Sequence, residues 1–178
     1  AQVRDTFSLT NMVMVGDRGM ITNARIEALR ELGGFGWVTA LRAPGIAALA
    51  ADDGPLQMSL FDQANLAEIT HPDFPGERLV ACRNPALAEH RARKRQALLE
   101  ATEVQLAKIA AAVTAGRLAG AGKIGTRFGK VIGRYKMGKH FTTNIDDATF
   151  TYTRNTAAIT AEAALDGIYV VRTTVPAE

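Results

Sequence analysis

Asp17 occupies the position in this sequence that is best suited to catalysis by a carboxylate. It follows the short apolar run Met12–Val15 and Gly16. An apolar run of this length predicts a strand buried on both faces of a sheet, and α/β proteins assemble their sites where such strands end. A carboxylate at that point can bind Mg²⁺ or Mn²⁺, which prefer oxygen ligands. Asp is also common in turns because of its own local hydrogen bonds, so a purely structural role for Asp17 stays open.

Residues 116–141 form a basic segment with seven Lys and Arg and neither Asp nor Glu. Residues 43–77 have the opposite composition, with six acids and no Lys or Arg. Such separation of charge predicts a face that binds a polyanion, although a solvated loop without a partner is the alternative. The candidate contacts to DNA phosphates are the basic residues of the second half: Lys130, Arg134, Lys136, Lys139 and His140. Tyr135 and Phe141 lie among them and can stack on an exposed base.

Other parts of the sequence offer weaker candidates for a site. The bases at 91–95 lie near Glu89 and Glu100 at helical spacing, which slightly favours a solvated face over a phosphate site. The glycine-rich segment has Thr126 where a P-loop requires lysine, and neither of the two serines lies in a G-x-S-x-G motif. The single cysteine, Cys82, excludes an internal disulfide, and its apolar neighbours predict a buried, unreactive thiol.

A strand–helix–strand unit is predicted to position Asp17. After the strand at 12–15, Thr22 or Asn23 can cap a helix that runs to about Glu31. Residues 36–41 then have the apolar pattern of a second strand. This order and spacing predict an α/β fold that begins with two parallel strands joined by a helical crossover.

Beyond residue 42 the sequence changes character, because Pro and Gly interrupt it repeatedly. We expect, in order, short antiparallel strands near Asn65–Thr70 and Glu77–Cys82, a helix at 85–115, a strand at 148–153, a short helix at 156–165 and a strand at 168–174. The long helix starts with Asn84 as its cap and Pro85 at its first position. Its apolar side consists of Leu99, Leu106, Ile109 and Val113. The glycines between residues 120 and 130 argue against a further helix there.

No apolar run approaches the roughly 18 residues that a membrane helix needs. With 47% apolar and 22% charged residues, the chain has the composition of an ordinary folded domain. We therefore expect a cytoplasmic protein without a membrane partner.

The residues around Asp17, 13–22, resemble the second-aspartate motif of bacterial insertion-sequence transposases that have a DDE catalytic domain. Further motifs follow in the order expected of one subgroup of these transposases. They are Arg83–Asn84–Pro85, the basic residues to Arg95, Tyr135–Lys136, Lys139–His140–Phe141 and Leu165–Asp166–Gly167–Ile168–Tyr169–Val170 with Arg172–Thr173. The resemblance thus spans almost the whole chain.

The resemblance implies a ribonuclease-H-like fold in which Asp17 is the second of three catalytic carboxylates. Residues 1–42 would then be part of the catalytic core, and residues 43–178 a β-rich insertion with the long helix and the basic segment. The family member would bind two Mg²⁺ or Mn²⁺ ions, act on transposon and target DNA, form a dimer and associate with the nucleoid. Arg18 would lie near the scissile phosphate.

The chain contains no counterpart of the family's first-strand Asp or of its helical Glu motif. We therefore expect an internal fragment that has no nicking activity by itself. Two alternatives stay open: a non-catalytic nucleic-acid-binding remnant of a decayed transposase, and a structural fragment without affinity for DNA.

Overall fold

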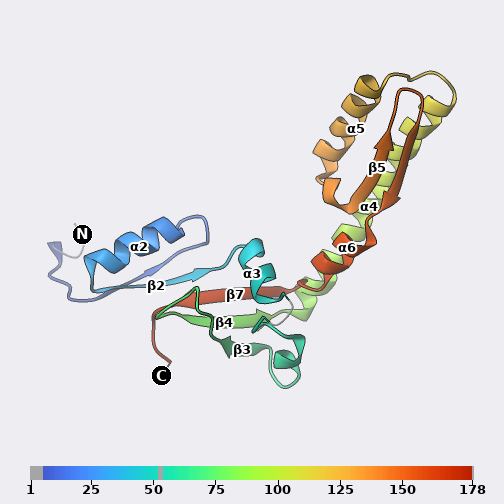
Figure 1. Ribbon diagram of the computed structural model, residues 1–178. Helices are drawn as coiled ribbons and strands as arrows, with labels where there is room; N and C mark the ends of the chain where they lie inside the picture. The colour runs from blue at the N-terminus through green and yellow to red at the C-terminus, as the bar shows by residue number, and fades with distance from the viewer. Residues whose placement is uncertain (1–5, 52–53, 178) are drawn as a thin grey trace. The chain divides into compact units, whose positions relative to one another are not determined.

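The computed structural model describes residues 6–51 and 54–177, which divide into two compact units. Unit 1 comprises Ala1–Pro85 and Gly167–Glu178, and unit 2 comprises Ala86–Asp166. The chain leaves unit 1 after strand β4 (Arg78–Arg83) and comes back to it as strand β7 (Ile168–Thr173) (Figure 1). Unit 2 is therefore inserted between two strands of the sheet of unit 1.

The sheet of unit 1 has five strands in the order β1-β2-β7-β4-β3. The remaining strands are β1 (Met12–Val15), β2 (Phe35–Ala40) and β3 (Leu66–Ile69). β1 and β2 are parallel, as the strand–helix–strand pattern predicted, and all the other neighbours are antiparallel. The predicted antiparallel pairing of β3 with β4 is confirmed.

Helix α2 (Asn23–Leu32) joins the two parallel strands. The Thr22 side chain caps it by accepting a hydrogen bond from the Arg25 amide, and Gly33 follows its last turn. Its buried residue Ile26 packs with Ile21 and Trp37, which anchors the helix to the sheet. The sequence did not predict two short elements that follow, α3 (Ala43–Leu49) and the 3₁₀ helix η1 (Met58–Phe61).

β1 corrects one prediction, because it is not buried on both faces. Among the described residues it pairs only with β2 and so forms an edge of the sheet. The exposed fractions of Val13, Met14 and Val15 are 52%, 41% and 75%. An apolar run alone does not distinguish a central strand from an edge strand, since burial depends on the neighbours that the fold supplies.

Unit 2 packs helices against a two-stranded antiparallel sheet. Its elements are α4 (Pro85–Thr114), α5 (Ala121–Tyr135), the 3₁₀ helix η2 (Gly138–His140), β5 (Phe141–Ile145), β6 (Phe150–Arg154) and α6 (Thr156–Ala163). The predicted apolar side of the long helix is confirmed, since Leu99, Leu106, Ile109 and Val113 are buried in one cluster. Ile124 of α5, Met137, Phe141 of β5 and Phe150 of β6 complete that core.

Helix α5 is the second correction, because the glycines of this segment argued against a helix. Two contacts supplied by the turn between β5 and β6 explain its start: the Ala121 amide donates to Asp147 Oδ1 (2.9 Å), and the Gly120 amide donates to the Asp147 carbonyl (2.7 Å). The helix also places Ile124 in the core and Phe128 against it. Tertiary contacts therefore offset the low helix propensity of glycine.

The predicted α/β class is confirmed, with a mixed sheet in unit 1 and a small second sheet in unit 2. The two compact units do not coincide with the division at residue 42, which separated a catalytic part from an insertion by family resemblance. That division stays a prediction. Within the ranges that the structure covers, no helix has both the length and the apolar character needed to cross a membrane.

Candidate functional site

Asp17 lies in the turn between β1 and α2, with its carboxylate exposed. Its Oδ1 accepts hydrogen bonds from the backbone amides of Gly19 and Met20, both at 2.8 Å. The hydrogen bonds from Met20 and Gly19 hold the pKa of Asp17 below its ordinary value, so the group is ionised at neutral pH. Asp17 therefore has the turn-forming role that the sequence left open. Its other carboxylate oxygen, Oδ2, takes no part in these two hydrogen bonds.

In the part of the chain that the structure describes, Asp17 is not joined by other carboxylates in a group that could hold a divalent ion. No group of three or more His, Cys, Asp or Glu gathers anywhere in residues 6–51 and 54–177 in a way that would hold a metal. Mg²⁺ is often bound by one or two carboxylates together with substrate phosphates, so Asp17 fits as one ligand of such a site. Arg18, the predicted phosphate contact, is exposed in the same turn.

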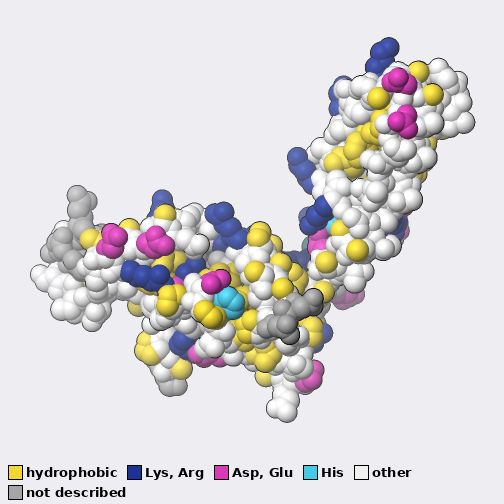
Figure 2. Space-filling model, viewed as in Figure 1, with side chains coloured by type: hydrophobic (Ala, Val, Ile, Leu, Met, Phe, Trp, Pro, Cys, Tyr) yellow, Lys and Arg dark blue, Asp and Glu magenta, His cyan; other side chains and the backbone are white. Residues whose placement is uncertain are grey.

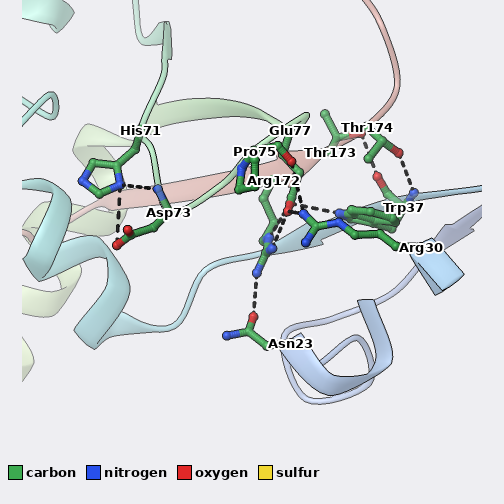
Figure 3. A network of polar contacts seen from close by, with 10 residues as sticks. All are labelled: Asn23, Arg30, Trp37, His71, Asp73, Pro75, Glu77, Arg172, Thr173 and Thr174. Carbon is green, nitrogen blue, oxygen red and sulfur yellow. Dashed lines mark hydrogen bonds and ion pairs between the residues drawn. The ribbon is translucent and has the colours of Figure 1, made fainter. Parts of the chain in front are cut away.

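A buried polar network lies behind this turn, and sequence reasoning did not find it (Figure 3). Glu77, whose side chain has no exposed area, accepts two hydrogen bonds from Arg172 at 2.6 Å each. Arg30 donates to the same carboxylate at 2.7 Å, and Trp37 Nε1 donates to it at 3.0 Å. The sequence carries no signal for this network, because Arg30 precedes Glu77 by 47 residues and Arg172 follows it by 95.

The charge balance of this network keeps Glu77 ionised. Burial raises the pKa of the Glu77 carboxyl, but the hydrogen bonds from Arg172 and Trp37 and the charges of Arg172 and Arg30 outweigh burial. The net result is a pKa below the ordinary value. Since Arg172 also donates to Asn23 Oδ1 at 2.7 Å, the network joins β7 to the first turn of α2. It thereby supports the segment that carries Asp17.

The structure separates the predicted DNA contacts of the basic segment into two groups. Lys130, Arg134 and Lys136 are exposed on α5 or at its end. Lys139 is exposed but forms an ion pair with Glu162. His140 has no exposed area, and its Nε2 lies 3.0 Å from Glu162 Oε2. The assignment of His140 as a surface phosphate contact is therefore corrected, because DNA has no access to its ring in this structure.

The aromatic residues of this segment are also turned inward. Phe141 is buried in the core of unit 2, and Tyr135 packs against that core. Phe141 is therefore unavailable for stacking on a base, and the guanidinium of Arg134 already lies over the Tyr135 ring, 5.5 Å from its centroid. The helical spacing of α5 brings Lys123 and Arg127 to the surface beside Lys130. The sequence did not predict either as a contact, because its glycines argued against a helix here.

Two of the bases at 91–95 form ion pairs with acidic residues of unit 2. Arg95 is buried and binds Asp166 through two hydrogen bonds, at 2.9 and 2.6 Å. Arg93 pairs with Glu89 one helical turn away, as the favoured interpretation of a solvated face predicted. Cys82 is buried as predicted, and burial raises the pKa of its thiol.

Comparisons with family models, with curated proteins and with solved structures found no match for this chain.

Proposed function

We propose that this chain is part of a DDE-type DNA transposase with a ribonuclease-H-like core, in which Asp17 is one of three metal-binding carboxylates. The observation that carries the proposal is the place of Asp17: an exposed carboxylate at the carboxyl end of β1, in a parallel β1–α2–β2 unit. This is the position at which α/β sheets present catalytic side chains.

The open edge of β1 supports the proposal that this sheet belongs to a larger one. Large apolar side chains on an edge strand are unfavourable in water and favour pairing with a further strand. Val15 is 75% exposed, and Met14 and Met20 line an apolar groove of about 250 Å³ beside α2. A neighbouring strand that brings the first catalytic Asp would cover this edge and place that residue near Asp17.

In the proposed enzyme the residues of this chain hold and orient the reacting groups. Asp17 offers an ionised oxygen ligand, while its hydrogen bonds to Gly19 and Met20 fix the direction of the carboxylate. Bound Mg²⁺ or Mn²⁺ ions would supply Lewis acidity for phosphoryl transfer. Arg18, which is exposed in the same turn, would bind a phosphate next to Asp17. The other two acids lie outside these 178 residues, so the chain alone does not cleave DNA.

The test begins with the reading frame that surrounds this chain. We expect an upstream Asp at the end of a strand and a downstream Glu on a helix, both in frame. The protein encoded by that frame should nick transposon-end DNA with Mg²⁺, and Asp17→Asn should abolish nicking. Asn keeps the acceptor for the Gly19 and Met20 amides, so the turn is preserved while the charge is lost. The matched control is Asp62→Asn, an exposed acid in another loop, which should retain activity.

Retained nicking by Asp17→Asn, or a frame without the two acids, would reject the catalytic proposal. The second candidate function, a DNA-binding remnant, is favoured by the charge of unit 2. That unit has 13 Lys and Arg and 7 Asp and Glu, whereas the remainder of the chain has 8 and 11. A frame without the acids, together with retained DNA binding, would select the remnant.

A further inference from the structure

Helix α5 presents four bases on a single face. Lys123, Arg127, Lys130 and Arg134 are spaced by four, three and four residues, and all four are exposed. At 3.6 residues per turn they fall within a sector of about 60°, and they extend over about 16 Å along the axis. In Figure 2, Lys and Arg side chains protrude from unit 2 on the side where Figure 1 draws α5. We call these four residues the basic face of α5.

Among the residues that the structure describes, the basic face of α5 forms no ion pair. Other bases of unit 2 have carboxylate partners: Arg95 pairs with Asp166, and Arg154 with Glu103. For Lys123, Arg127 and Lys130, no carboxylate oxygen lies within ion-pair distance in the described parts of the chain. Like charges one helical turn apart destabilise a helix, so an external anion would stabilise this one.

A shallow hollow adjoins the basic face of α5. Lys123, Arg127 and Lys130 line it together with Arg117, which comes from the loop between α4 and α5. The other lining residues include Gly122 and Thr126, which are small and allow close approach of a ligand backbone. A basic, open and shallow surface of this length suits an extended polyanion better than a small molecule.

The surroundings of the face favour duplex DNA over other polyanions. An anionic membrane would require apolar side chains beside the bases, but Ile124 and Phe128 of α5 are directed into the core. Single-stranded nucleic acid would require exposed aromatic rings, and α5 contributes only Phe128 and Tyr135, which pack against that core. A length of about 16 Å is sufficient to reach phosphates on both sides of a groove about 12 Å wide.

We propose that the basic face of α5, with Arg117 beside it, binds the phosphate backbone of duplex DNA without reading the base sequence. α5 has no Asn, Gln, Asp or Glu between residues 121 and 135, so it lacks the amide and carboxylate side chains that recognise adenine and cytosine edges. The inference rests on the proposed function for the identity of the duplex, a transposon end, whereas the contact itself requires neither a metal ion nor Asp17.

The test measures binding of the full 178-residue chain to a short fluorescein-labelled duplex by anisotropy, with EDTA present, over a series of KCl concentrations. Five phosphate contacts, four from α5 and one from Arg117, predict a slope of about −4.5 in log Kobs against log salt, of which α5 supplies about −3.6. The test variant replaces the basic face of α5 by glutamine: K123Q, R127Q, K130Q and R134Q. The control variant removes the same charge from exposed positions of α4: R91Q, R93Q, K94Q and K108Q.

The α5 variant should lose most of the slope, and the control should keep it. Circular dichroism checks that each variant is folded. Should the fourfold α5 variant be unfolded, the double variant R127Q/K130Q replaces it and should reduce the slope by about 1.8. If the α5 variant and the control variant lost equal parts of the salt slope, the inference would be overturned. Tighter binding to a single strand, to phosphatidylserine vesicles or to one duplex sequence over another would overturn it as well.

The two proposals fail separately. The binding measurement contains EDTA, so its outcome does not depend on metal binding by Asp17. If the reading frame encodes neither the upstream Asp nor the downstream Glu, the transposase proposal is rejected. Salt-dependent DNA binding by α5 would still support the inference about α5. If binding to duplex DNA did not depend on salt, the proposed role of α5 would be rejected. The catalytic proposal for Asp17 would still be decided by the nicking assay.

Discussion

The two units of this protein use charged residues in opposite ways. Unit 1 carries a net negative charge and places an ion network in its interior, where Glu77 holds Arg172 and Arg30. Unit 2 has an apolar core of helix and strand residues and presents most of its bases to solvent. A buried ion network therefore helps to hold unit 1 together, whereas in unit 2 the charge on α5 is available for binding.

This difference leads to a prediction for unit 1 that has the largest expected effect. Glu77→Gln should destabilise unit 1 by about 3–5 kcal/mol, since it leaves the buried Arg172 guanidinium without a balancing charge. Trp37 is the only tryptophan of the chain and donates to Glu77, so its fluorescence reports unfolding of unit 1 directly. The control is Glu68→Gln, which removes a partly exposed partner of Arg78 and should have a much smaller effect.

The same network makes unit 1 sensitive to acid. Because the pKa of Glu77 is lower in the folded state than its ordinary value of 4.5, its contribution is complete above about that pH. It is lost as the pH falls through the lower, folded-state pKa. The stability of the unaltered chain should therefore approach that of Glu77→Gln in acid. A constant difference down to the lowest pH would contradict this assignment.

A smaller expected effect, confined to unit 2, tests whether the apolar core dominates there. Leu106 has no exposed area, and Leu106→Ala should destabilise unit 2 by about 2–5 kcal/mol through lost burial and the cavity that remains. The helical circular dichroism of α4 and α5 should then melt earlier, while the Trp37 transition stays in place. A parallel shift of both signals would show that the units unfold together and would weaken the comparison.

The smallest expected effect concerns the glycines of α5. Gly129 lies in helical conformation and an added Cβ would meet nothing within 4 Å, so Gly129→Ala should stabilise unit 2 by about 0.5–1 kcal/mol. Gly120, the residue before the helix, has equally open surroundings but a φ of 91°. Gly120→Ala should therefore destabilise the unit, and thermal melts of the two variants separate backbone conformation from crowding. If Gly129→Ala and Gly120→Ala both lowered the stability of unit 2, backbone conformation would not explain the difference between the two positions.

Several elements were predictable because their signals are local. The apolar run at Met12–Val15, the cap at Thr22 and the next apolar run describe β1, α2 and β2 within a few residues. The apolar positions of α4 recur at helical spacing, so its buried side follows from periodicity alone. The place of Asp17 in the turn after β1 also followed from the order of these elements.

Other features depend on residues that are distant in the chain. Arg172 reaches Glu77 only because β7, which follows unit 2 in the sequence, pairs with β2 and β4. His140 was expected at the surface because its neighbours are basic, but its position after α5 buries it beside Glu162. Composition near a residue does not specify which element will cover it.

The sequence by itself determined the α/β class, the strand–helix–strand unit with Asp17 at its turn, the long helix α4 and the concentration of bases in residues 116–141. The tertiary structure alone decided that part of this segment is the helix α5, because Asp147 and the core of unit 2 outweigh the low helix propensity of its glycines. Helix formation in turn brought Lys123 and Arg127 into line with Lys130 and Arg134. Short-range patterns are encoded locally, whereas the alignment of charges on one surface depends on contacts that only the folded chain makes.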